Sequence, residues 1–220
     1  EKLKGIITVD DIIDVMEEEA TEDMYKFAGS SEHEREVAEK ENPTLREQII
    51  SALRGRLPWL IITLVGGLLA SLILSNLDYI MNPVYAPLVF FIPVVIGMGG
   101  NIGTQSSSVT VITLSNKDLN FSNVVREGIV GIITGLLCSI ITGIVIYFVM
   151  RKLDIVLIVS ISLFINMVLG ATIGAFMPVL LKKMDADPST VSSPIISTAL
   201  DITGIAVYFI ITTALLSKIV

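Results

Sequence analysis

Long apolar segments constrain this chain more than any other feature. Each is long enough, at about 1.5 Å per residue, to cross about 30 Å of hydrocarbon as a helix. They lie at roughly residues 57–77, 84–114, 122–150, 155–181 and 189–217. With 52% hydrophobic residues and a mean hydropathy of +0.77, the 220-residue chain is too apolar for a soluble domain of this length. The sequence predicts an all-α polytopic membrane protein with five transmembrane helices over residues 57–220.

The excess negative charge lies before the first apolar segment. Residues 1–56 carry 15 acidic and 8 basic side chains, whereas residues 57–220 carry seven of each. The formal net charge of -7 therefore belongs to a soluble front end. This balance is consistent with the lipid bilayer and cations as partners, and it gives no indication of nucleic-acid binding.

The front end is predicted to contain a strand, a linker and two helices. LKGIITV, residues 3–9, is typical of a β-strand, and the acidic stretch after it is typical of a helix over residues 10–27. Residues 28–41 are polar and predict a linker. The Asn-Pro pair that follows marks a helix start, so we expect residues 42–56 to form an amphipathic helix along the lipid headgroups.

Basic residues at the ends of the spans predict the orientation. Cytoplasmic flanks usually carry more Lys and Arg than outer flanks. With the N-terminal side in the cytoplasm, seven lie at inner flanks and three at outer flanks. The inner ones are Arg46, Arg54, Arg56, Lys117, Arg126, Lys182 and Lys183, and the outer ones are Arg151, Lys152 and Lys218.

One carboxylate, Asp201, stands inside the last apolar segment, where it is the only charge in residues 188–217. With a helix start near 189 it lies about 18 Å along the helix, close to mid-bilayer. A carboxylate there costs about 2.5 to 3.5 kcal/mol, so it should face protein or water. Since no basic residue lies centrally in a span, we expect a cation from solution to compensate it. Alternatively, Asp201 is protonated, or bonds Thr198 or Thr203 and locks the bundle.

The second unusual stretch is FFIPVVIGMGGNIGTQSSS, residues 90–108. Pro93 and four glycines weaken a helix where polar side chains appear, and unwound backbone is tolerated only in protein or beside a wet cavity. We therefore expect carbonyl and amide oxygens to face a pore here. Gly97 and Asn101 lie four residues apart and so share a helical face.

The last segment repeats this arrangement. Pro188 and Pro194 are predicted to interrupt the helix before Asp201, and Ser197 stacks on the same face as Asp201. Two broken helices would then contribute neutral oxygens and one carboxylate. Elsewhere, GIITG at 131–135 and GATIG at 170–174 place glycines four apart, which is typical of close helix packing.

Hard oxygen ligands without thiolate or imidazole suit Mg²⁺, with Mn²⁺ as a second possibility. Mg²⁺ sheds water reluctantly, so a carboxylate and a few oxygens can hold a hydrated ion weakly and release it. The chain has no Walker-type phosphate loop to suggest a pump, and we expect no enzymatic activity.

Three segments, in this order, resemble the MgtE family of magnesium channels over nearly the whole chain. They are GIITVDDIIDVMEEEATED at 5–23, FIPVVIGMGGNIGTQ at 91–105 and DPSTVSSPIISTALDITG at 187–204. Residues 1–9 are similar to the end of a CBS domain, and residues 10–41 to the family's connecting, or plug, helix and its linker. The family's N domain and most of its CBS domains have no counterpart in this chain.

The resemblance implies a homodimer in the plasma (inner) membrane, with a pore on the two-fold axis lined by spans two and five. It implies that Asp201 and Asn101 hold a hydrated Mg²⁺ and that carbonyls near Gly97 and Ser197 add contacts. Ser193 replaces an asparagine of some relatives, which puts a side-chain ligand there in doubt. The remaining implied site residues are Asp187 at the cytoplasmic mouth and Asp11, Asp14 and Glu19, which bind regulatory Mg²⁺ and close the gate.

Two other functions fit the residues. A coupled secondary transporter or exchanger, in which Asp201 binds a proton or Na⁺, also predicts a mid-membrane acid beside broken helices. A membrane anchor that dimerises a CBS sensor explains the front end but not the Gly and Pro breaks. The acidic run by itself is most often a solvated helix face that binds nothing specific.

Overall fold

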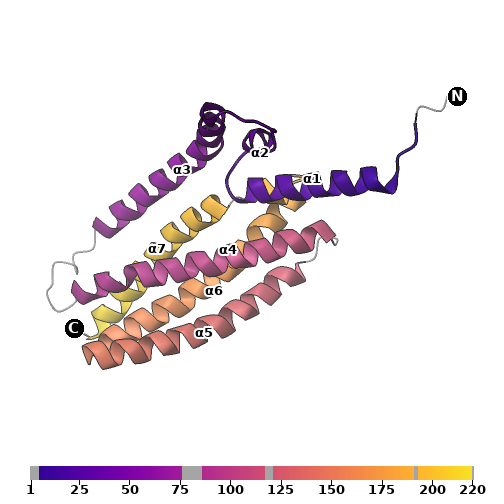
Figure 1. Ribbon diagram of the computed structural model, residues 1–220. Helices are drawn as coiled ribbons and strands as arrows, with labels where there is room; N and C mark the ends of the chain where they lie inside the picture. Colours follow the sequence, from indigo (N-terminus) through magenta and orange to yellow (C-terminus); the bar gives the residue numbers. More distant parts are fainter. Residues whose placement is uncertain (1–4, 76–85, 117–120, 191–192, 220) are drawn as a thin grey trace.

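The computed structural model describes residues 5–75, 86–116, 121–190 and 193–219, and this part of the chain is helical with no strand. Five helices are long and apolar enough to cross a membrane, which confirms the predicted fold class. Four of them, α4 to α7, lie side by side, while α3 leans against α7 and α1 lies across one end of the bundle (Figure 1). The bounds are α1 Val9–Phe27, α2 Glu32–Ala38, α3 Leu45–Ser75, η2 Ala86–Phe91, α4 Ile92–Asn116, α5 Ser122–Met150, α6 Leu153–Lys183, η3 Pro188–Thr190 and α7 Ser193–Ile219.

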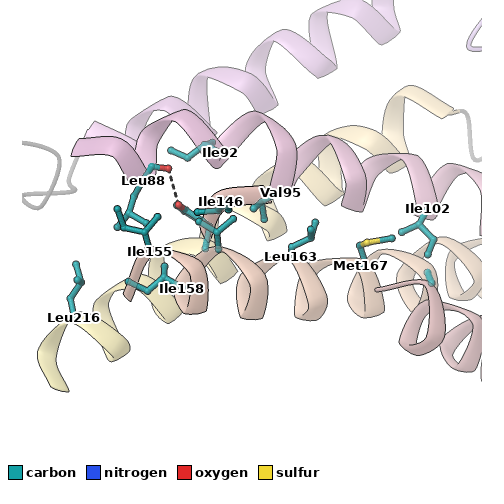
Figure 2. Close-up of a cluster of buried hydrophobic side chains, with 13 residues drawn as sticks. Leu88, Ile92, Val95, Ile102, Ile146, Ile155, Ile158, Leu163, Met167 and Leu216 are labelled. Atoms are coloured by element: carbon teal, nitrogen blue, oxygen red, sulfur yellow. Dashed lines mark hydrogen bonds between the residues drawn. The ribbon is translucent and has the colours of Figure 1, made fainter. Parts of the chain in front are cut away.

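Helix α6 is the centre of the bundle. Half of the residues in its most apolar stretch are buried, compared with 11% in the corresponding stretch of α3. Helix α6 packs against α4, α5 and α7. Its Ile158, Leu163 and Met167 lie in the main cluster of buried apolar side chains (Figure 2). The Tyr208 hydroxyl of α7 donates a hydrogen bond of 2.8 Å to the Leu88 carbonyl in this cluster.

Glycines let α4 and α6 meet at their backbones. A Cβ added at Gly170 would lie 2.5 Å from the Gly99 carbonyl oxygen, and one at Gly174 would lie 2.1 Å from that of Gly103. Both distances are far below van der Waals contact, so only glycine fits. The predicted packing role of GATIG is therefore confirmed, and dispersion contacts across such close approaches hold helices together where lipid removes the hydrophobic driving force.

The expectation that the glycine-rich stretch is unwound is wrong. Helix α4 runs without interruption through Gly97, Gly99, Gly100 and Gly103, because two of these glycines serve the contact with α6. In the last segment the break precedes the span. Pro188 lies in the short helix η3, and Pro194 is the second residue of α7, where no helical hydrogen bond is lost.

The front end also differs from expectation. Residues 5–8 form no strand, and α1 begins at Val9 with a capping box between Thr8 and Asp11; residues 1–4 lie outside the described part. The linker at 28–41 contains α2, capped by Ser31. The amphipathic stretch and the first span form one continuous helix, α3, through Pro58.

Helix α2 is fixed to the start of the first span by charge. The Arg56 guanidinium of α3 donates from Nε to the buried Glu34 carboxylate at 3.2 Å. Hydrogen bonds from Arg56, followed by the smaller contribution of Ser30, hold the pKa of Glu34 below its ordinary value against the opposing effect of burial. The front end is thereby attached to the membrane-spanning helices.

Candidate ion site

Asp201 lies in α7 beside α4. A Cβ built on Gly100 would lie 3.9 Å from Asp201 Oδ1, so the carboxylate approaches α4 next to Asn101. The side chain is half-buried. Because α7 begins at Ser193 and not near 189, Asp201 lies only about 12 Å along the helix, nearer the start of the span than expected.

The carboxylate of Asp201 is left for a ligand from outside the chain. No hydrogen bond or ion pair reaches it among the described residues. The hydroxyls of Thr198 and Thr203, the alternative partners, instead donate to the carbonyls of Pro194 at 2.8 Å and Ala199 at 2.7 Å. Locking of the bundle through these two threonines is therefore not what the structure shows.

Helix α4 carries a polar stripe on its exposed face. Gly97, Asn101 and Gln105 are exposed and follow one another at intervals of four residues. The opposite face packs against α6, with Val95 and Gly99 buried there. Since lipid tails cannot solvate amide side chains, this stripe requires water or another protein surface.

The backbones expected to supply carbonyl ligands lie in regular helix. Gly97 is inside α4 and Ser197 is inside α7, so each carbonyl already faces a helical hydrogen-bond donor and has one remaining lone pair for a ligand. The Ser197 hydroxyl donates to the Pro194 carbonyl at 3.1 Å. The structure therefore brings Asp201 close to Gly100 of α4, the residue before Asn101. Gly97 and Ser197 precede Asn101 and Asp201 by about one helical turn.

At the other expected site, the described residues place a lysine where a metal was predicted. Asp187, in the turn before α7, accepts from Lys26 Nζ of α1 at 3.2 Å. Its other carboxylate oxygen accepts from the Ser189 backbone at 2.9 Å, and Lys26 also pairs with Glu22 at 2.7 Å. The acidic helix α1 is thus held against the turn before α7 by an ion pair that the sequence did not predict.

The pKa shifts of this pair give its pH range. Burial opposes ionisation of Asp187, but hydrogen bonds from Ser189 and Lys26 outweigh it and lower the pKa below 3.8. Glu22 and then Asp187 raise the pKa of Lys26. The carboxylate stabilises the contact above its ordinary pKa and loses this contribution as the pH falls, whereas the ammonium loses it only at strongly alkaline pH. Neutral pH lies inside that window.

The three acids expected to bind regulatory Mg²⁺ are not gathered into a metal site. Asp11, Asp14 and Glu19 are exposed on α1, and Asp11 is engaged by Thr8, whose hydroxyl and backbone hydrogen bonds lower its pKa. In the part of the chain that is described, no three His, Cys, Asp or Glu side chains are arranged to hold a metal ion. Within one copy, these acids therefore form no complete site.

Sequence reasoning missed a buried carboxylate behind the polar stripe. Glu127 of α5 is buried and accepts from the Ser106 hydroxyl of α4 at 2.9 Å and from the Arg126 guanidinium at 2.9 Å. Its sequence signal, an acid directly after a basic flank residue, is easily assigned to the headgroup region. The hydrogen bond from Ser106 makes Glu127 a link between α4 and α5, and Arg126 of the same helix compensates its charge.

A family model described as a divalent cation transporter, MgtE, matches residues 92–211. The chain belongs to the MgtE family. The matched range contains α4, α5, α6 and most of α7, including Asn101 and Asp201.

Three curated relatives, each named magnesium transporter MgtE, match nearly all of this MgtE family member. The Bacillus subtilis protein is 37% identical over 99% of the chain and 47% of its own length. The Thermus thermophilus protein is 32% identical over 99% and 47%, and the Enterococcus faecalis protein 34% over 94% and 44%. The chain thus spans about half the length of these relatives, whose names describe transport and no enzymatic reaction.

Removing the Lys26 ammonium should loosen α1. In Lys26→Ala, cleavage of α1 by a glutamate-specific protease should rise about threefold at pH 7. A partly exposed ion pair stabilises the protein only slightly, but here that small free energy opposes the local unfolding of α1. The control is Lys40→Ala. It removes a lysine that lies outside α1 and pairs with Glu47 at 3.7 Å. Equal cleavage of both variants would show that the Lys26–Asp187 pair does not hold the helix.

Proposed function

We propose that this chain forms the pore of a magnesium channel, which conducts hydrated Mg²⁺ down its electrochemical gradient into the cytoplasm. The observation that carries the proposal is the half-buried Asp201 carboxylate, which lies beside Gly100 of α4 without a partner among the described residues. An ionised group in a span needs a counter-charge or water. A travelling, still-hydrated cation supplies both.

The ligand chemistry favours Mg²⁺. One carboxylate and neutral oxygens from Asn101 and nearby carbonyls can hold an ion through its water shell, and Mg²⁺ keeps several waters in protein sites. Mn²⁺ accepts the same ligands. Weak holding permits release, and two charges moving inward gain about 4.6 kcal/mol per 100 mV of inside-negative potential.

A homodimer is part of the proposal. A single copy offers one carboxylate and an exposed polar stripe that lipid cannot solvate. A second copy related by a two-fold axis would place two Asp201 carboxylates and two stripes around one wet path. The relatives' printed names support transport of magnesium by the longer proteins.

Regulation and location follow the same assignment. We place the N-terminal side in the cytoplasm and the spans in the plasma (inner) membrane, as the basic flanks predict. Helix α1 contacts the turn before α7 through Lys26 and Asp187, which is where a gate helix has to act. In the full-length protein, cytosolic Mg²⁺ bound by acids such as Asp11, Asp14 and Glu19 would hold this helix closed.

The test is transport by the purified chain in proteoliposomes. At equal pH on both sides and without Na⁺, an inside-negative potential should drive Mg²⁺ uptake, and the protein should have the mass of two chains in detergent. Uptake that requires a proton or Na⁺ gradient would instead identify a coupled transporter. No uptake under either condition would leave the anchor of a sensor as the function.

A further inference from the structure

Asn166 of α6 is an amide buried between the two helices that carry the proposed ion site. Its side chain is fully buried, and Nδ2 donates to the Val95 carbonyl of α4 at 2.6 Å. Its Oδ1 is also buried and has no hydrogen-bond partner among the described residues. Asn166 is not one of the residues proposed to contact the ion.

Both neighbouring helices meet Asn166 with a glycine. A Cβ on Gly99 of α4 would lie 2.3 Å from Nδ2, and one on Gly204 of α7 would lie 2.9 Å from the same atom. The carboxamide thus fills the space between Gly99 and Gly204. Its size sets how close α4 and α7 come at this level of the bundle.

This level is that of the ion site. Gly99 precedes Gly100, which faces the Asp201 carboxylate, and Gly204 follows Asp201 by three residues. Residues two apart on a helix point about 200° apart. When Gly99 is held against Asn166, Asn101 therefore points away from α6, onto the exposed face of α4.

Packing alone does not explain an amide here. A buried acceptor without a partner destabilises a fold, and leucine, which has a similar branched shape, would fill the space without that penalty. The hydrogen bond to Val95 fixes the amide in one orientation, which an apolar side chain cannot do. A residue that lowers the stability of the fold in this way is expected where a functional site needs its helices in one fixed geometry.

We infer that Asn166 is a positioning residue of the ion path. It holds α4 and α7 at the separation and rotation at which Asn101 and Asp201 flank the passing ion. The inference rests on the proposed channel function, but its geometrical part concerns the helices alone.

The experiment compares Asn166→Leu with Ser162→Ala, a fully buried α6 residue one turn earlier whose hydroxyl also lacks a partner among the described residues. Mg²⁺ and Ca²⁺ uptake are measured in proteoliposomes. The α4–α7 distance is measured between spin labels at positions 109 and 210, in a Cys138→Ser background and with excess unlabelled chain. Asn166→Leu should lower Mg²⁺ uptake about tenfold and change the Mg²⁺ to Ca²⁺ ratio about threefold, with a shifted distance.

The outcomes separate the two ideas. Unchanged uptake ratio and unchanged distance in Asn166→Leu, or equal changes in Ser162→Ala, would overturn the positioning role. If Asp201→Asn leaves uptake intact, the channel proposal fails and the distance alone decides for Asn166. If Asn166→Leu does not fold, Gly204→Ala, which presses a methyl group on the same amide, is expected to shift both readouts and decides in its place.

Discussion

Asp201→Asn should abolish most Mg²⁺ uptake. Asparagine keeps the shape and the hydrogen-bonding oxygen but removes the charge, and in the proposed dimer two charges are lost at once. Because no hydrogen bond or ion pair compensates Asp201 among the described residues, we expect the ion to lose about 3 kcal/mol of stabilisation at this level, which corresponds to uptake about 100-fold slower. The measurement is the initial rate of uptake into proteoliposomes at fixed potential.

The matched control is Asp154→Asn, in the first turn of α6. It makes the same chemical change in the membrane domain but at the end of a span. Since a charge at a span end is screened by water and salt, this variant should keep at least half of the uptake. A normal rate in Asp201→Asn with unchanged preference for Mg²⁺ would remove Asp201 from the ion path.

Gly174→Ala should have the largest effect on stability. The added Cβ would lie 2.1 Å from the Gly103 carbonyl oxygen, 2.7 Å from its carbonyl carbon and 2.8 Å from its Cα. All three are backbone atoms, so no side chain can turn away and α4 must separate from α6. We expect a destabilisation of about 3 kcal/mol or more, or no folded protein. Thermal unfolding in detergent, followed by size-exclusion chromatography, measures it.

Gly67→Ala is the control for that experiment. Gly67 is exposed on α3, and a Cβ there meets nothing within 4 Å. The melting temperature of the Gly67→Ala variant should therefore lie within about 2 °C of that of the parent chain. Similar melting of Gly174→Ala and Gly67→Ala would mean that the α4–α6 backbone contact is not as close as the structure has it.

The spans were predictable because their cause is local. In lipid every backbone amide must bond within its own helix, so length and apolar composition are enough to mark a membrane helix. Asp201 stood out for the same reason, as a charge in such a segment. The family, too, was evident from three short segments, because their residues are specific and their order is shared.

The ends of the elements were less predictable. Ile6, Ile7 and Thr8 have β-branched side chains but no partner strand in the described chain, so residues 5–8 form no strand. Helix α2 arises in a polar stretch because Ser31 caps it and Glu34 pairs with Arg56. A local prediction fails when a segment with strand propensity has no strand to pair with, and also when a contact with a distant residue stabilises a helix in a polar segment.

The roles of the glycines and of several polar residues became clear only from how the helices pack. Gly99 and Gly103 were expected to unwind α4 and instead bring it against α6. Lys26 meets Asp187 across 161 positions of sequence, and Asn166 meets Val95 across 71. Local composition was enough to tell which segments cross the membrane and which acid stands among them, whereas the neighbours of these residues depend on contacts between helices far apart in the chain, which no local pattern records.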